Sequence, residues 1–363
     1  KDGTLLGHNT DYDGFAYMLR SAGTELRGKK ALILGTGGLG DKNFNDMAYA
    51  GMQAAQTELG ITFDYLEPET VSDYVPNLRT MCEAGDYDLI VCLGSDMSDA
   101  LTEVAADFPN QKFSHVDSSL KLDNVSAVAT KWQEQTFLTG VLAGLGTISD
   151  MPLANEENVI GVILGQENPA LRKGVVGYIA GAKYVNPDVT VNVKWTGSWF
   201  DPATETATAT ELVNSGSDVV IAYLDSLNAA IAAADLGAYS FGYATSGYET
   251  IPDSYLTSPA CDWESFFLND VQRIIDGTWT GTNQWLGMED GLVSLCDMHN
   301  LADGTEEKVQ AAIDGFTNGT LDIWTGEILD NEGNVAVAEG ETLSDADLLS
   351  LSWFVDGVNG SVN

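Results

Sequence analysis

Residues that could contact a ligand stand where two apolar, strand-like runs end. Asp117 directly follows the run Phe113–Val116, and Gly94 and Ser95 directly follow the run Leu89–Leu93. Open α/β sheets bind ligands beyond the carboxyl ends of their strands. The Asp117 carboxylate and the backbone N–H groups of Gly94 and Ser95 are therefore candidate ligand contacts. The alternatives are a solvated carboxylate and a plain turn.

A second group of candidates stands at the start of a stretch of helical period, Asn45–Leu59. Asn45 offers both a donor and an acceptor to the edge of a ligand, and Asp41 could accept a hydrogen bond from one. Both residue types also cap helices, so capping is the alternative role. Phe44, between them, has the flat apolar face that a planar heterocycle needs, although aromatic side chains more often lie in a core.

The sequence shows no catalytic or metal-binding pattern. The three histidines lie far apart, none of the four cysteines forms a CxxC pair, and there is no G-x-S-x-G run. We therefore expect no hydrolase activity and no metal. Cys92 lies in an apolar run and is expected to be a buried free thiol, whereas a bridge between Cys261 and Cys296 is possible.

The elements that would position these residues alternate between strand and helix from Lys29 onward, which predicts parallel sheets with helices on both faces. The predicted strands are Ala31–Leu34, Leu89–Leu93, Phe113–Val116, Val159–Leu164, Val189–Val193, Val219–Ala222 and Ser240–Tyr243. The predicted helices are Asn45–Leu59, Met97–Phe108, Trp132–Leu145, Ala170–Lys183, Thr204–Ser215 and Leu227–Leu236. The tail is expected to form a helix, a hairpin and a final apolar helix at Leu348–Val355.

A chain of 363 residues is too long for one ordinary core and long enough for two α/β lobes. A polar stretch with Pro152, at Thr147–Asn158, marks one crossing between them. We expect a first lobe of residues 29–148 plus about 256–298, and a second lobe of residues 149–255 plus about 299–363.

Residues 1–28 do not fit this pattern. The run Asp2–Asp11, followed by Gly14 and Phe15, resembles a stretch of shikimate dehydrogenase. The strand Lys30–Leu34 then leads into Gly35–Gly40, which satisfies G-x-G-x-x-G, a turn that binds dinucleotide phosphates. The resemblance implies an oxidoreductase as an alternative function. The other interpretation is that Gly35–Gly40 is the first strand-to-loop turn of a binding protein, with residues 1–28 joined by fusion or artefact.

The chain from about Lys29 to Asn363 resembles a different family, the basic membrane protein family of solute-binding proteins. The matching stretches include, in order, Gly40–Asn45, Asp86–Ile90, Gln133–Gly140, Gly177–Tyr178, Thr196–Trp199, Asp218–Val220, Leu343–Asp345 and Trp353–Val355. This family includes purine-nucleoside receptors that feed ABC transporters. The resemblance implies a hinged type I periplasmic-binding-protein fold, with a nucleoside, nucleobase or related heterocycle as ligand. It also implies a binding protein with no cofactor rather than an enzyme. The alternative on the same scaffold is a ligand sensor.

The resemblance also implies which residues hold the ligand. The similar receptors sandwich a purine between two aromatic side chains, which correspond to Phe44 and Trp199 here. The acidic residue that binds ribose is absent from the matching stretch around Tyr243, and the usual glycine pair is replaced around Tyr223 and Asp225. Tyr223, Asp225 and Tyr243 are therefore expected to build a different second wall, with a packing role as the alternative for each.

The charge balance limits the partners. With 16 Lys and Arg against 54 Asp and Glu, the formal net charge is −38, and such a field repels nucleic acid. No run is long and apolar enough to span a bilayer, and no signal peptide or lipobox cysteine is present, so the N-terminus is expected to be processed, truncated or replaced. The resemblance implies an extracytoplasmic protein, with an ABC permease and ATPase as partners and a lipid anchor outside this chain.

Overall fold

The structure, a computed structural model, describes residues 29–35, 39, 44–68, 70–148, 150–167, 169–244 and 246–359. They divide into two units. Unit 1 takes its described residues from Lys1–Gly37, Ala48–Val128 and Glu264–Gln284, and unit 2 from Gly38–Met47, Ala129–Trp263 and Trp285–Asn363. Residues 39, 44–47, 129–148, 256–263 and 285–298 were expected in the first lobe but group with unit 2 in this division.

Unit 1 is built on a six-stranded sheet in the order β11-β5-β4-β3-β1-β2. Its strands are β1 (Lys30–Leu34), β2 (Thr62–Leu66), β3 (Leu89–Leu93), β4 (Phe113–Val116), β5 (Val125–Thr130) and β11 (Thr282–Leu286). Strands β1 to β5 pair in parallel. The helices are α2 (Phe44–Leu59), α3 (Tyr74–Ala84), α4 (Ser98–Asp107) and α9 (Trp263–Ile275), with short 3₁₀ turns η1 (Val71–Asp73) and η2 (Ser95–Met97).

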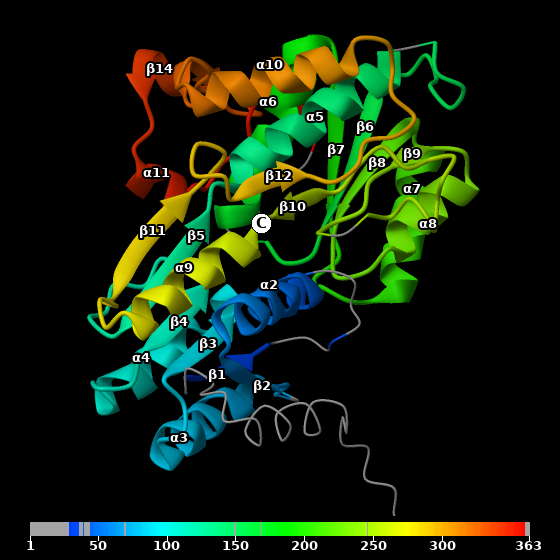
Figure 1. Ribbon diagram of the computed structural model, residues 1–363. Helices are drawn as coiled ribbons and strands as arrows, with labels where there is room; N and C mark the ends of the chain where they lie inside the picture. Colours follow the sequence, from blue (N-terminus) through cyan, green and yellow to red (C-terminus); the bar gives the residue numbers. More distant parts are fainter. Residues whose placement is uncertain are drawn as a thin grey trace, which may run out of the picture. The chain divides into compact units, whose positions relative to one another are not determined.

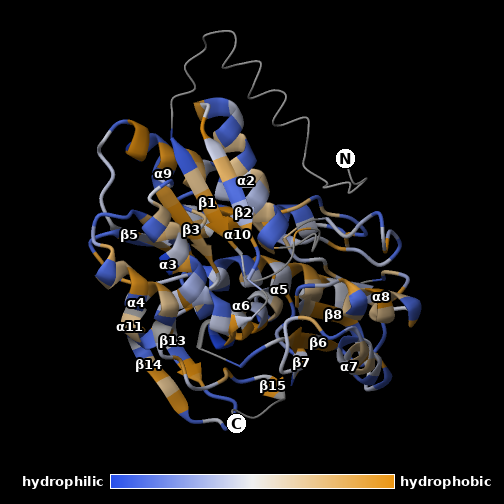
Figure 2. Ribbon diagram, turned by 90° about the horizontal axis from the view of Figure 1, so that it is seen from below, coloured by the Kyte–Doolittle hydropathy of each residue, from blue (hydrophilic) through white to orange (hydrophobic). Residues whose placement is uncertain are grey.

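The core of unit 1 forms where α3 and α4 cover the sheet. Leu78 of α3 and Leu101 of α4 pack with Ile90 and Cys92 of β3, and all four side chains are fully buried. A continuous apolar strand buried on both faces is typical of parallel sheets, and β3 has all five residues buried. Figure 2 shows the same hydrophobic colouring along β3 and along β6 and β8 of unit 2.

Unit 2 is built on a five-stranded parallel sheet in the order β15-β7-β6-β8-β9. Its strands are β6 (Val159–Leu164), β7 (Thr190–Trp195), β8 (Ser217–Tyr223), β9 (Tyr239–Ser240) and β15 (Val358–Asn359). Helices α5 (Trp132–Ile148) and α6 (Pro169–Val185) lie on one side of these strands, and α7 (Pro202–Asn214) and α8 (Asn228–Asp235) on the other (Figure 1). The α/β class expected from the sequence is confirmed.

Helices α5 and α6 pack backbone to backbone. A Cβ atom on Gly181 of α6 would lie 2.0 Å from the Phe137 carbonyl oxygen, and one on Gly140 of α5 would lie 2.2 Å from the Tyr178 carbonyl oxygen. Neither position has room for a methyl group, so the glycines set the distance between the helices. This pair forms the inner layer of unit 2, where 15 of the residues of α5 are buried.

The tail of the chain completes unit 2. It contains α10 (Thr305–Thr317), the two-stranded ladder of β10 (Pro259–Cys261) with β12 (Val293–Leu295), the hairpin of β13 (Thr325–Leu329) with β14 (Val335–Thr342), and α11 (Asp345–Leu349). The predicted final helix at Leu348–Val355 is wrong, because the helix ends at Leu349. Beyond it the chain is extended: Phe354 stacks on Trp195, and Val355 bridges to Asp330.

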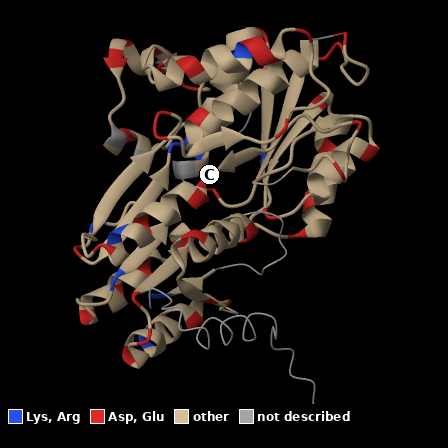
Figure 3. Ribbon diagram, viewed as in Figure 1, with Lys and Arg blue, Asp and Glu red and all other residues tan. Residues whose placement is uncertain are grey.

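Acidic residues are spread over helices of both units, whereas basic residues are sparse (Figure 3). Several of the basic residues form ion pairs at the surface. Arg79, for example, lies 2.9 Å from Glu103 and 2.7 Å from Asp107, and Lys194 lies 2.8 Å from Glu211. In the described part of the chain, no helix has both the length and the apolar character needed to cross a bilayer.

Candidate functional site

The loops that leave β6, β7 and β8 meet at one edge of the unit 2 sheet. In the parallel register, Leu164 at the end of β6 lies opposite both Trp195 of β7 and Tyr223 of β8. The loops are bonded to each other, since the Gly197 N–H donates to the Gly165 carbonyl at 2.9 Å. This is the carboxyl edge of the sheet, where ligands bind in open α/β folds.

Trp199 lies in the loop between β7 and α7 and is partly exposed. A Cβ atom on Gly165 would lie only 2.6 Å from Trp199 Cε3, so a bare glycine backbone is what lets the indole pack there. The Trp199 carbonyl accepts a hydrogen bond from the Asp225 N–H at 2.9 Å, and the indole meets the Tyr223 ring at a centroid distance of 6.3 Å. Three predicted site residues, Trp199, Tyr223 and Asp225, are thus brought together.

Four aromatic side chains gather at this edge, and we call them the aromatic cluster: Trp132, Trp199, Tyr223 and Tyr243. The Tyr223 and Tyr243 rings are 4.3 Å apart between centroids, and their hydroxyls are hydrogen-bonded at 2.8 Å. Trp132 lies edge-on to Tyr223 at 5.5 Å and tilted to Tyr243 at 6.1 Å. Trp199 is the member of the cluster with partial exposure, while the other three are buried.

Trp132 is the member of the cluster that was not among the predicted site residues. It is the first residue of α5, and the loop before it is anchored: the Lys131 N–H donates to the Leu286 carbonyl at 2.8 Å. The Glu134 carboxylate accepts from the Met288 N–H at 2.7 Å, which fixes the first turn of the helix. Burial raises the pKa of Glu134. The available signal was the position of Trp132 two residues after the strand β5.

Tyr243 is positioned by an extended segment that follows β9. The Gly242 N–H donates to the Thr257 carbonyl at 3.0 Å, and the Ala244 N–H donates to the Pro259 carbonyl at 2.8 Å. Ala244 has φ +62°, in the left-handed region that residues with a Cβ seldom adopt. The two hydrogen bonds on either side hold this turn, so the direction of the Tyr243 side chain is set by the backbone.

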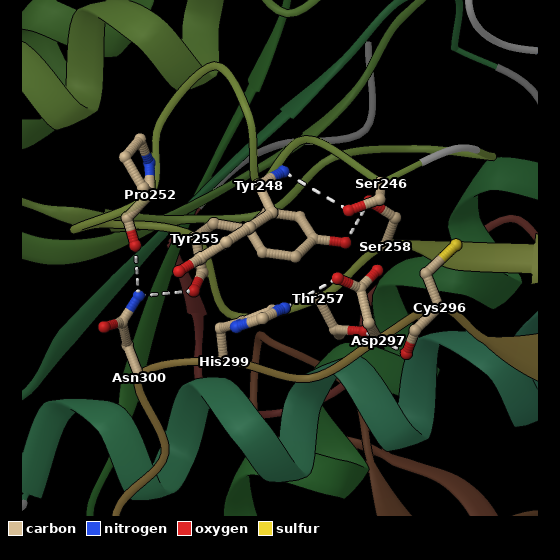
Figure 4. Close-up of polar contacts among 10 residues, drawn as sticks. All are labelled: Ser246, Tyr248, Pro252, Tyr255, Thr257, Ser258, Cys296, Asp297, His299 and Asn300. Carbon is tan, nitrogen blue, oxygen red and sulfur yellow. Dashed lines mark hydrogen bonds and ion pairs between the residues drawn. The ribbon is translucent and has the colours of Figure 1, made fainter.

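The chain after this turn is held in place by the contacts drawn in Figure 4. His299 stacks on Tyr248 with a centroid distance of 3.7 Å, and its Nε2 lies 2.6 Å from Asp297 Oδ2. Asn300 Nδ2 donates to the carbonyls of Pro252 and Tyr255, at 2.8 Å each. These contacts anchor the segment from Tyr248 to Tyr255, and no predicted site residue lies among them.

The predicted contacts in unit 1 lie at the carboxyl edge of its own sheet. Leu93 pairs with Val116, so Gly94 and Asp117 leave neighbouring strands, and the Gly94 N–H donates to the Val116 carbonyl at 3.2 Å. Both residues turn with positive φ, at +94° for Gly94 and +59° for Asp117. Ser95 begins η2 directly after Gly94. These three residues are therefore neighbours at this edge.

His115 supports this edge from inside the core. Its side chain is fully buried, and its Nε2 lies 2.9 Å from the Gly94 carbonyl oxygen, so the neutral imidazole donates to it. Burial lowers the pKa of His115 to about 4, and Nδ1 has no hydrogen-bond partner among the described residues. The imidazole thereby fixes the carbonyl at the point where the chain turns away from β3.

Phe44 and Asn45 are the first two residues of α2. Phe44 is half-buried and meets the Trp263 ring edge-on, with centroids 6.5 Å apart. Asn45 is buried, with 3% of its surface exposed. Asp41 lies outside the described residues. The two predicted stacking residues therefore contact different aromatic partners, Trp263 for Phe44 and Tyr223 for Trp199.

The cysteines are free thiols, and the Cys261–Cys296 bridge that the sequence left possible is not formed. In the β10–β12 ladder Cys261 pairs with Val293, three residues before Cys296, so the ladder register keeps the two sulfurs apart. Cys92 is fully buried, as expected. Among the described residues, no group of three or more His, Cys, Asp or Glu side chains could hold a metal ion.

Two parallel sheets flanked by helices, with candidate ligand contacts at their carboxyl edges, are the arrangement found in periplasmic solute-binding proteins. The model of the ABC transporter substrate-binding protein PnrA-like family matches residues 29–318, and the chain belongs to this family. It is a substrate-binding protein of ABC transporters rather than an enzyme. Proteins of this class bind small molecules, act outside the cytoplasm and work with a membrane permease and ATPase.

Several relatives share most of their length with this chain. A purine-binding protein of Brucella abortus is 30% identical, over 79% of this chain and 80% of the relative. The provisionally named glucose-binding protein TsgA13 of Haloferax volcanii is 28% identical over 83% and 73%, and an uncharacterised lipoprotein of Pyrococcus furiosus is 29% identical over 81% and 76%. A solute-binding protein of Aeropyrum pernix has the same fold, with a TM-score of 0.73 at 24% identity over 81% of this chain and 92% of that one.

The comparisons give no support to the dehydrogenase alternative. The family match begins at residue 29, so the glycine-rich run Gly35–Gly40 lies inside the binding-protein match. Gly35 directly follows β1 and donates its N–H to the Leu66 carbonyl of β2 at 3.2 Å, as a strand-to-loop turn of this sheet would. The shikimate-like residues 1–28 lie outside the described residues.

Proposed function

We propose that this protein binds a purine base, a nucleoside or a related flat heterocycle and delivers it to an ABC importer. The observation that carries the proposal is the aromatic cluster at the carboxyl edge of the unit 2 sheet. Aromatic rings supply a large contact area with little conformational freedom to lose on binding. The partly exposed Trp199 would offer the stacking face, and the buried tyrosines behind it would hold that face rigid.

The polar residues would supply orientation. Asp225 beside Trp199, and Asp117, Gly94 and Ser95 on the unit 1 edge, offer carboxylates and backbone N–H groups that suit the edge of a base. Phe44 is the proposed second stacking face, with Asn45 and Asp41 next to it. We propose that units 1 and 2 are the two lobes, and that closure around the ligand is the state that the permease recognises.

The name of the Brucella relative supports the purine class, and the name of the Haloferax relative supports a sugar as the second candidate. Aromatic faces and carboxylates suit both classes. We further propose that the protein works at the outer face of the cell membrane or in the periplasm, with a lipid anchor, in line with the lipoprotein name of the Pyrococcus relative.

Calorimetry with adenosine, guanosine, hypoxanthine and glucose tests the ligand class. We expect binding of at least one purine compound, and a loss of at least tenfold in affinity for Trp199→Ala, because the stacking face is removed. Phe200→Ala is the matched control, since this neighbouring ring is 62% exposed and outside the cluster. Binding of glucose alone would contradict the purine proposal, and equal losses in the two variants would contradict the role of Trp199.

A further inference from the structure

Glu205 is a buried carboxylate to which neither the sequence pattern nor the comparisons give a role. It lies in the first turn of α7, and its side chain is 0% exposed. Burying a carboxylate is costly unless hydrogen bonds replace the lost water. Glu205 must therefore be held by specific partners, and those partners indicate what it does.

The two carboxylate oxygens of Glu205 accept hydrogen bonds from two different loops. Oε1 accepts from the Asp201 N–H at 2.8 Å, in the loop between β7 and α7. Oε2 accepts from the Ser226 hydroxyl, in the loop between β8 and α8. The Ser226 oxygen in turn accepts from Asn228 Nδ2 at 2.7 Å, so the second loop is also fixed to the start of α8.

A helix-capping role alone does not explain this arrangement. The cap of α7 is already made by Asp201, whose carboxylate accepts from the N–H groups of Ala203 and Thr204. Glu205 adds a bond to the backbone of the capping residue itself and a second bond outside the helix. Its bond to Ser226 contributes nothing to the helix end, but it joins two loops.

These two loops carry the residues proposed to contact the ligand. Trp199 lies two residues before Asp201, and Asp225 directly precedes Ser226. The loops also touch directly, since the Asp225 N–H donates to the Trp199 carbonyl at 2.9 Å. The Glu205 carboxylate lies behind this contact as a second, fully buried connection between the same loops.

We propose that Glu205 is a positioning residue: by bonding Asp201 and Ser226 at once, it fixes the Trp199 indole and the Asp225 carboxylate relative to each other. The positioning follows from the contacts within unit 2, whereas its effect on ligand binding rests on the proposed function. Binding sites need side chains locked by a supporting layer of hydrogen bonds, and a loosened loop weakens a ligand contact that is otherwise intact.

The test reads the environment of Trp199 without any ligand. The protein is labelled with 5-fluorotryptophan, and the Trp199 signal is assigned in ¹⁹F NMR spectra by comparison with Trp199→Phe. We expect Glu205→Ala to shift or broaden the Trp199 signal. Gly165→Ala, whose Cβ would displace the indole, is the positive control. Glu211→Ala is the negative control, since it removes an exposed carboxylate of the same helix that pairs with Lys194.

Glu205→Gln provides the conservative comparison. Its amide oxygen can accept from the Asp201 N–H and its amide nitrogen can donate to Ser226, so we expect a Trp199 signal closer to that of the unmutated protein. An unchanged Trp199 signal in Glu205→Ala, matching Glu211→Ala, would overturn the inference. If Glu205→Ala does not fold, Ser226→Ala removes the bond between the loops while leaving the Asp201 bond, and the same two readings apply.

A second measurement connects positioning to binding. Adenosine and hypoxanthine are titrated calorimetrically into the full chain and into the same variants. We expect at least a tenfold loss of affinity in Glu205→Ala, a smaller loss in Glu205→Gln and none in Glu211→Ala. If the unmutated protein binds neither compound, the purine proposal fails, but the ligand-free Trp199 signal still decides whether Glu205 positions the indole.

Discussion

His115 and Gly165 shape the carboxyl edges of their sheets. Gly165 lets the Trp199 indole lie against the backbone, and His115 holds the carbonyl of Gly94 from within the core. Both are residues that a sequence pattern assigns to a turn or a strand. The strand-end positions of Asp117, Gly94 and Ser95 could be predicted from the sequence, whereas these supporting contacts depend on tertiary neighbours.

Acidification should destabilise the protein through His115. Its pKa of about 4 in the folded state lies below the ordinary value near 6.5, so the unfolded chain takes up the proton first as pH falls. This contribution to stability is complete above about pH 6.5 and is lost progressively down to about pH 4. Between pH 6.5 and 5 we expect the free energy of unfolding to fall by about 2 kcal/mol more than in His115→Gln.

Urea unfolding at the two pH values measures this difference. The comparison between the two proteins removes the contribution of the acidic side chains, which titrate in both. Parallel losses in His115→Gln and the unmutated protein would show that the imidazole does not stay neutral in the folded state.

Among the helices and strands, buried strands were easier to predict from the sequence than a half-exposed edge strand. β3, β4 and β6 match their predicted bounds. β3 and β6 are apolar along their whole length, as expected for strands buried on both faces, whereas β4 also holds the buried Ser114 and His115. β2 was missed, since Thr62–Leu66 is a half-exposed edge strand with an acidic residue at its centre. The final helix was wrong because packing of Phe354 on Trp195 overrides the local helical pattern. Trp132 was missed because an aromatic residue at a helix start is usually read as core.

The close contact between α5 and α6 predicts that one methyl group added at Gly181 lowers the stability of the protein strongly. In Gly181→Ala the new Cβ would lie 2.0 Å from the Phe137 carbonyl oxygen, and backbone cannot move aside as a side chain can. Overpacking of this kind costs about 1–3 kcal/mol, and we expect at least the middle of that range. Gly174→Ala on the same helix is the control, because its Cβ would make an ordinary contact of 3.5 Å with Thr136.

Chemical denaturation of the two glycine variants measures the effect. The helix itself gains from either substitution, since alanine is the better helix former. Gly181→Ala should therefore be clearly less stable than Gly174→Ala. Equal stability would mean that the helices can separate without loss, contrary to the packing described.

The whole molecule is dominated by its acidic charge. Even if each of the 16 Lys and Arg residues were paired with one of the 54 Asp and Glu residues, 38 acidic side chains would remain unbalanced. Repulsion among them opposes the compact state, and mobile ions weaken repulsion between exposed charges that lie more than about 10 Å apart at 0.1 M salt. The ion pairs between exposed side chains contribute little against this field.

Salt should therefore stabilise this protein. We expect the midpoint of thermal unfolding to rise between 0.05 M and 1 M KCl, because screening relieves more repulsion than it weakens attraction. NaCl at the same concentrations is the control for a specific cation effect, and the two salts should act alike. A midpoint that falls with added salt would show that the ion pairs, and not the net charge, govern stability.

The reactivity of the four free cysteines can be used to measure unfolding of the chain. Cys82, Cys92 and Cys261 are buried, and burial raises the pKa of Cys82 and of the half-buried Cys296 to about 11, so few reactive thiolates exist at neutral pH. We expect a chromogenic disulfide reagent to react with few thiols of the native protein and with four thiols per chain in denaturant. The absorbance of the released thiolate would then measure the fraction of unfolded molecules without any substitution in the chain.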